Sequence, residues 1–182
     1  VTRLDISMDD LSAVDAYGVG GGAAGAYGRR YGQGMLSREG GSAGTESAVD
    51  ASLRWMRRHV NKKGYWSFDN YSAHCQGAPG CAGTGLNGYE VMASSQVLLS
   101  YLGNGHSHRF GTFKRQVRSG LKYLMSKQKA NGSLAYDGQD YALLNHAFGT
   151  LALCEGFAMS RDFKLKKYCH KAVEFLLSAQ NK

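Results

Sequence analysis

The stretch from Tyr123 to Ser133, YLMSKQKANGS, decides the fold, because related stretches occur twice more in the chain. One is Trp55 to Ser67, WMRRHVNKKGYWS, and the other is Phe175 to Asn181, FLLSAQN. Each stretch begins in the order aliphatic, charged, aromatic, apolar: Leu53-Arg54-Trp55-Met56, Leu121-Lys122-Tyr123-Leu124 and Val173-Glu174-Phe175-Leu176. The spacings between these units are 68 and 52 residues. A unit that recurs in this way predicts a protein built from helical repeats.

Apolar residues with a period near 3.6 predict five major helices. The expected ranges are 45–61, 89–102, 113–128, 141–159, and a fifth helix that starts near residue 164. Thr45 is the predicted N-cap of the first helix, and Gly64 is its predicted stop. The second and fourth helices are more apolar, and the fourth is apolar nearly all round, which indicates burial on most sides. The expected order is outer, inner, outer, inner, outer.

The repeat predicts packing roles for several residues. Leu53, Leu121 and Val173 are expected to face the inner helices. Trp55, Tyr123 and Phe175 are expected to occupy equivalent places on successive outer helices. The Gln and the Gly turn are expected to cap each outer helix, and the aromatic after the turn, Trp66 in the first unit, to pack back on the hairpin.

The three repeated stretches resemble the prenyltransferase/squalene-cyclase-like repeat. In that family an aromatic and a leucine precede a glutamine and then an Asn/Asp-Gly turn that ends in Trp. The resemblance covers residues 45–182 and is nearest to uncharacterised bacterial members, secreted or envelope-associated, with a Gly-rich N-terminal segment. It implies an all-α domain of helical hairpins that forms part of an α/α toroid. A complete toroid has about six hairpins, and this chain carries about two and a half, so either a fragment or an open apolar edge is expected.

Residues 1–44 form a Gly-rich tail that precedes the repeat domain of residues 45–182. Eleven glycines lie between Gly18 and Gly44, and such a stretch buries too little apolar surface to offset its backbone entropy. We expect the tail to be held by another copy of the chain, with Tyr17, Tyr27 and Tyr31 as anchors. The expected product is a homo-oligomer or a filament.

The four cysteines leave several interpretations open. Cys75 and Cys81 flank a short Gly/Pro loop and predict either a local disulfide, two free thiols or ligands of a metal. Cys154 and Cys169 lie within helical patterns. His146 and Cys154 lie on one helix, but zinc needs a third protein ligand, so core packing of Cys154 and a buried, hydrogen-bonded His146 are favoured. The His106-Ser107-His108 and His74-Cys75 pairs are interpreted as loop residues rather than metal ligands.

No complete catalytic motif is present. Cyclases that this chain resembles protonate their substrate with an Asp-rich inner helix, whereas Asp9-Asp10 lies in the tail. Asp137 and Asp140 fall in the turn before the fourth helix, where a solvated turn and an N-cap are expected. A thioester needs Cys followed closely by Glu-Gln, and Cys81 is followed by Ala82-Gly83. We therefore predict no catalytic residue, no cofactor and no resident metal.

The net charge of +8 comes from Lys and Arg spread along the helices, which is typical of solvated outer faces. No aromatic RNA-binding pattern or basic-region helix favours nucleic acid. No apolar run reaches the ~18 residues of a membrane span. The expected function is a structural or interaction scaffold, extracellular or in the cell envelope. The alternatives are a fragment of a terpenoid-cyclase or prenyltransferase-like enzyme without its catalytic half, and an extracellular ligand-binding module.

Overall fold

The computed structural model describes residues 40–180 except residues 76–79, 84, 137 and 139. Within these residues the fold is all-α, with five α-helices, one short 3-10 helix and no strand. The helices are α3 (Ala43–Arg58), η2 (Ser72–His74), α4 (Glu90–Gly103), α5 (Lys114–Lys127), α6 (Ala142–Ser160) and α7 (Phe163–Ser178). The prediction of five major helices is confirmed, and the bounds that the structure shows differ from the expected ones by only a few residues.

The first helix starts slightly earlier than predicted. Ser42, not Thr45, is the N-cap of α3, because its hydroxyl accepts a hydrogen bond from the backbone N–H of Thr45. The Thr45 hydroxyl in turn accepts from the N–H of Ser42 at 2.8 Å, which completes a capping box. Thr45 thus takes part in the capping box, but it lies three residues after the N-cap, inside the helix.

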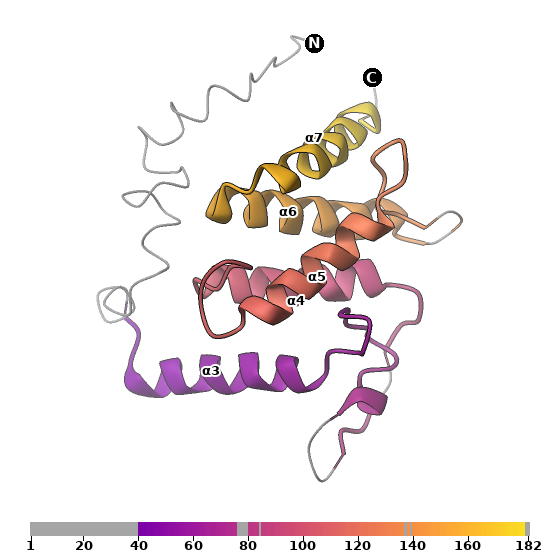
Figure 1. The fold of residues 1–182 in the computed structure, drawn as a ribbon. Helices are drawn as coiled ribbons and strands as arrows, with labels where there is room; N and C mark the ends of the chain where they lie inside the picture. The colour runs from indigo at the N-terminus through magenta and orange to yellow at the C-terminus, as the bar shows by residue number, and fades with distance from the viewer. Residues whose placement is uncertain (1–39, 76–79, 84, 137, 139, 181–182) are drawn as a thin grey trace.

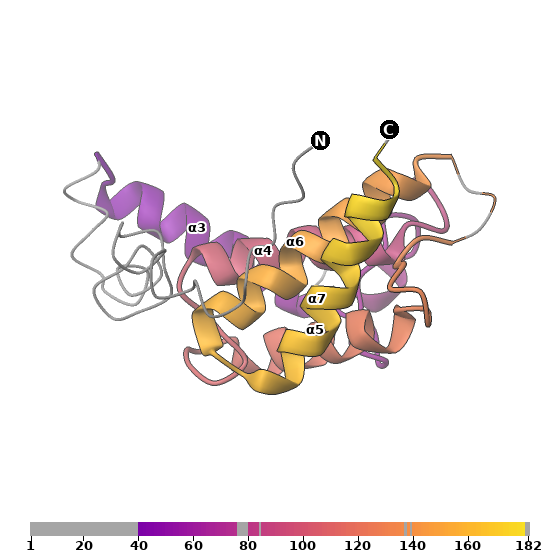
Figure 2. The same ribbon diagram turned by 90° about the horizontal axis from the view of Figure 1, so that it is seen from above.

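The two apolar helices α4 and α6 form the centre of the molecule. They pack against each other, while α5 packs on α4 and α7 packs on α6 (Figures 1 and 2). Each inner helix buries residues along most of its length, whereas Leu53 is the one buried residue of α3. The prediction that the second and fourth helices are the inner ones is confirmed. The toroid itself stays a prediction.

The repeat is visible in equivalent hydrogen bonds. In the turn after α3, the N–H of Asn61 donates to the carbonyl oxygen of Tyr65 at 3.0 Å. In the turn after α5, the N–H of Lys129 donates to the carbonyl oxygen of Ser133 at 2.8 Å. Asn61 and Lys129 are 68 residues apart, which is the spacing of the first two units. Gln128 closes the second turn with a 3.2 Å bond to the carbonyl oxygen of Gly132, as expected of the repeat glutamine.

Each turn is also tied to an inner helix at an equivalent position. The N–H of Trp66 donates to Ser94 Oγ of α4, and the N–H of Leu134 donates to His146 Nδ1 of α6, both at 3.0 Å. Ser94 and His146 are 52 residues apart, like the second and third units. The connection from turn to inner helix spans 28 residues in the first repeat and 12 in the second. The first repeat therefore carries an insertion of 16 residues.

The predicted packing residues divide into two groups. Leu53, Leu121, Trp66 and Tyr123 are buried, and Trp66 also donates its indole N–H to the carbonyl oxygen of Met56 at 2.7 Å. The prediction for Val173 is wrong, because its side chain is 38% exposed.

The three repeat aromatics are not equally buried either. Tyr123 is buried under Tyr65, which stacks on it with ring centroids 4.6 Å apart. Trp55 is 40% exposed, and Phe175 is half-buried with its ring edge against His146. The repeat thus preserves the position of the aromatic along each helix, while its surroundings depend on the insert or turn beside it. The tail anchors Tyr17, Tyr27 and Tyr31 lie outside the described residues.

Candidate functional site

The C-cap of α3 is a buried histidine, His59, which sequence reasoning did not single out. Its Nδ1 lies 2.6 Å from the carbonyl oxygen of Trp55. Because a carbonyl only accepts, Nδ1 carries the proton and donates this bond. In the neutral ring, Nε2 then keeps its lone pair and points at Cys81 Sγ, 3.1 Å away. The indole of Trp55 stacks on the imidazole with centroids 3.9 Å apart and holds its orientation.

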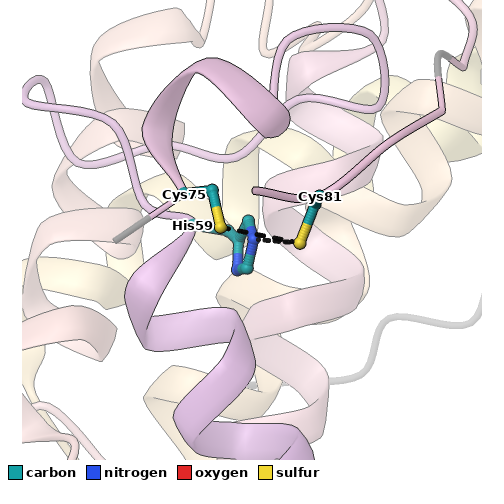
Figure 3. A group of neighbouring side chains, drawn as sticks. All are labelled: His59, Cys75 and Cys81. Carbon is teal, nitrogen blue, oxygen red and sulfur yellow. Dashed lines mark hydrogen bonds between the residues drawn. The ribbon is translucent and has the colours of Figure 1, made fainter. Parts of the chain in front are cut away.

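The insertion of the first repeat brings two thiols to His59. Cys75 follows η2, Cys81 lies further along the insertion, and their sulfurs are 3.6 Å apart (Figure 3). No disulfide joins them, because an S–S bond is about 2.05 Å long. The neighbouring thiol of Cys75 holds the pKa of Cys81 above its ordinary value. Nε2 of His59 and both sulfurs lie within 4.8 Å of one another. We call these three residues the His-Cys-Cys cluster.

The disulfide of the described chain lies elsewhere. Cys154 of α6 and Cys169 of α7 are bonded, with their Cα atoms 5.2 Å apart. The expectation that Cys154 is a packing residue is therefore wrong: its sulfur links the last inner helix to the last outer helix. The two cysteines are 15 residues apart in separate helices, and the sequence of two helices does not show which of their faces meet.

His146 is a core residue of α6, as predicted. It is fully buried, with Nδ1 accepting from the N–H of Leu134 and Nε2 donating to the carbonyl oxygen of Ala172 at 3.0 Å. Burial lowers the pKa of His146, so the ring is neutral. Both ring nitrogens are engaged by backbone groups, which leaves no lone pair for a metal. His146 instead connects the second turn to α7.

The two histidines of the loop after α4 also have structural partners. Nε2 of His108 donates to Asp162, the N-cap of α7, at 3.0 Å. Burial lowers the pKa of His108, and the backbone N–H of Lys164 lowers that of Asp162. The ring of His106 meets Phe113 edge-on at 4.9 Å. His74 lies in η2 beside Cys75 but is not part of the His-Cys-Cys cluster.

The aspartates considered for acid catalysis do not form a site in the described residues. Asp140 is exposed, and its carbonyl oxygen accepts from the hydroxyl of Tyr89 at 2.9 Å. The N-cap of α6 is Tyr141 without a side-chain hydrogen bond, so the predicted aspartate cap is wrong. Asp9-Asp10 and Asp137 lie outside the described residues.

One face of α6 is apolar and exposed. Leu143, Leu144 and Leu151 are 53%, 47% and 52% exposed, although the opposite side of the helix is buried. Ala147 and Phe148 are half-buried between them. These five residues are called the α6 apolar face. An exposed apolar patch on an otherwise well-packed domain is typical of an interaction surface.

A basic pocket lies between the first turn and α5. It has a volume of about 510 Å³, and its lining includes Lys62, Lys63, Lys122 and Lys127. The stacked rings of Tyr65 and Tyr123 also line it, and burial raises the pKa of Tyr123, which keeps the phenol neutral. Several ammonium groups beside tyrosine rings suit an anionic ligand with a flat or apolar part.

Comparison with protein-family models, with curated proteins and with solved structures finds no match to this chain. None of the helices in the described part combines the length and apolar content needed to cross a membrane.

Proposed function

We propose that this chain is a non-catalytic scaffold of helical repeats that assembles with further copies of itself. In this proposal the N-terminal tail of one copy docks on the α6 apolar face of another. The observation that carries the proposal is the exposure of Leu143, Leu144 and Leu151 on an inner helix. Covering such leucines removes apolar surface from water, which favours association.

The charges of the two surfaces are complementary. Residues 1–16 carry four aspartates and one arginine, a net charge of −3, together with Leu4, Ile6, Leu11 and Val14. The one charged residue of α6 is Glu155, but the adjacent α7 carries four lysines: Lys164, Lys166, Lys167 and Lys171. An acidic segment with apolar side chains suits an apolar face whose neighbouring helix is basic, since opposite charges steer the encounter.

The tail is proposed to act between copies. Tyr17, Tyr27 and Tyr31 are its further anchors, because an aromatic ring supplies a large contact area at a small entropy cost. A tail that docks on the next copy makes a heterologous contact, and repeated contacts of this kind give a ring or an open filament. If the tail instead covers the face of its own domain, the protein stays a monomer.

The test is the oligomeric state of the full chain, measured by sedimentation velocity over a wide concentration range. Association is expected, and the double variant Leu144→Ser/Leu151→Ser should abolish it. Leu86→Ser is the matched control, because Leu86 is an exposed leucine that is not part of α6. Replacing Asp5, Asp9, Asp10 and Asp15 by Asn should weaken association, and so should higher salt.

Deleting residues 1–39 tests the contribution of the tail separately from that of the α6 apolar face. This deletion leaves the capping box of α3 intact. A wild-type protein that is monomeric at every concentration would overturn assembly. Association that survives both the deletion and the leucine substitutions would overturn the proposed contact.

We also propose an extracellular or cell-envelope location. The Cys154–Cys169 disulfide supports it, because such bonds persist in oxidising compartments and are rare in the cytosol of most organisms. Fractionation of the native host with an antibody against the full chain tests this location. Recovery of the protein only in the cytosol, with both thiols reduced, would contradict it.

The basic pocket favours a second candidate function, an extracellular ligand-binding module for an anionic glycan. Its lysines and stacked tyrosines support this candidate. Calorimetry with a sulfated oligosaccharide and an uncharged one of equal length tests it. Binding of the sulfated probe should be lost in Lys122→Ala/Lys127→Ala and kept in Lys167→Ala, which changes a lysine of α7 outside the pocket. Equal binding of both probes would rule the candidate out.

A further inference from the structure

We propose that the His-Cys-Cys cluster of His59, Cys75 and Cys81 binds one zinc ion with three protein ligands and one open position. This proposal is independent of the assembly proposed above, since none of its three residues belongs to the tail or to the α6 apolar face. It also differs from the predicted local disulfide, which would consume both thiols.

The separations between the ligand atoms suit tetrahedral zinc. With Zn–S bonds of about 2.3 Å and Zn–N bonds of about 2.0–2.1 Å, tetrahedral angles place two sulfurs about 3.8 Å apart and a sulfur and a nitrogen about 3.6 Å apart. The observed separations are 3.6 Å between the sulfurs and 3.1 Å between His59 Nε2 and Cys81 Sγ. The third separation, between His59 and Cys75 Sγ, is within 4.8 Å. An ion therefore fits after the thiol protons leave and the side chains adjust to these tetrahedral separations.

The tautomer of His59 is the one that a metal ligand needs. Its Nδ1 donates to the carbonyl oxygen of Trp55, so the lone pair of Nε2 faces the sulfurs. Metal-bound histidines are commonly held in this way by a backbone carbonyl on the other nitrogen. The Trp55 ring stacks on the imidazole of His59 and orients it further. The ring of Tyr71 lies nearby, with its centroid 5.9 Å from that of the imidazole. The ring is preorganised before a metal arrives.

The charge and softness of the ligands select the metal. Two thiolates neutralise a divalent cation, and the imidazole is neutral. Thiolate and imidazole ligands suit zinc or copper, whereas magnesium, calcium and manganese prefer oxygen. No fourth His, Cys, Asp or Glu of the described residues belongs to the cluster. The remaining tetrahedral position is therefore left for water or an external ligand, as in zinc sites that act on a substrate.

The position of the cluster determines which parts of the chain a bound zinc ion would link. His59 terminates α3, whereas Cys75 and Cys81 belong to the insertion that the second repeat lacks. Zinc would tie this insertion to the end of α3. It would also protect two neighbouring thiols from oxidation in a chain that forms a disulfide elsewhere.

The experiment measures zinc in the full chain without a purification tag, after anaerobic reconstitution with zinc sulfate and removal of loosely bound metal. One zinc per chain is expected by elemental analysis. Cys75→Ser, Cys81→Ser and His59→Gln should each reduce it to background. The matched control is His74→Gln, which removes the histidine next to Cys75 and should retain one zinc per chain.

A second measurement guards against variants that fail to fold. Cobalt(II) added to the wild-type protein should give a thiolate-to-cobalt charge-transfer band and the visible bands of a tetrahedral site, and zinc should displace both. Substoichiometric zinc, zinc retained by the three variants, or cobalt spectra without a thiolate band would each overturn the proposal. A Cys75–Cys81 disulfide, found by peptide mapping of protein isolated from its native host without reductant, would also overturn it.

Discussion

Gly64 and Gly132 hold the same position in two successive repeats. Their φ angles are +84° and +91°, a region that favours glycine. At Gly64 an added Cβ would collide with Ser119 of α5, and at Gly132 with the backbone of Lys171 of α7. Ser119 and Lys171 are themselves 52 residues apart, the spacing of the second and third units. Each turn glycine thus permits the next outer helix to approach closely.

Replacing Gly132 with alanine is expected to destabilise the protein by about 2–5 kcal/mol, because left-handed strain and a steric clash add. Gly138→Ala is the matched control: its φ is +74°, but no atom lies within 4 Å of the added Cβ. The control should lose only about 1–2 kcal/mol. Urea unfolding followed by circular dichroism measures both, and equal losses would show that the approach of α7 is unimportant.

Truncating Leu121 tests the core beneath α5. Leu121→Ala is expected to lower the free energy of unfolding by about 2–5 kcal/mol, since Leu121 is 2% exposed and belongs to the hydrophobic core. Leu86→Ala should change it by less than about 0.5 kcal/mol, because Leu86 is exposed. The same unfolding measurement applies. A small effect at Leu121 would contradict its assigned role in the repeat.

Removing the disulfide tests the link between α6 and α7. The variant Cys154→Ser/Cys169→Ser is expected to lose about 3 kcal/mol, the loop-closure value for a separation of 15 residues. Reductant should destabilise the wild type but not this variant. If reductant destabilises both equally, the sensitive cysteines are not this pair.

Stability should depend on pH through His146. Burial lowers its pKa in the folded state from the ordinary 6.5, so the unfolded chain binds the proton more readily. The free energy of unfolding is therefore fully retained above about pH 6.5 and falls as the pH drops below it. His108 and His106, whose pKa values are also lowered by burial, act in the same direction.

Urea unfolding between about pH 8 and pH 5 measures this dependence. His146→Gln should flatten the loss of stability on the acid side, whatever its effect at neutral pH. His170→Gln is the control, because it removes an exposed histidine of α7. An unchanged acid-side slope in His146→Gln would show that this ring is not the sensitive group.

The candidate sites were less predictable than the helices. The sequence indicated a site at the Cys75–Cys81 loop, because two cysteines flank a short turn. In the structure their sulfurs are 3.6 Å apart. His59 was missed, because nothing along the chain links a helix-terminal histidine to a sulfur 22 residues later. The lengths of the two turn-to-helix connections differ by 16 residues, which marks the insertion as the part of the first repeat that the second repeat lacks.

The sequence by itself determined the helices, their order and the repeat. Periodicity, capping residues and turn glycines act within a few residues of one another, so the chain carries them in readable form. Tertiary structure alone decided that Cys154 pairs with Cys169, that His59 meets two thiols, and that Val173 is left exposed while Leu121 is buried. These outcomes depend on which helix faces meet across the core and on what covers the last outer helix, and no local pattern encodes either.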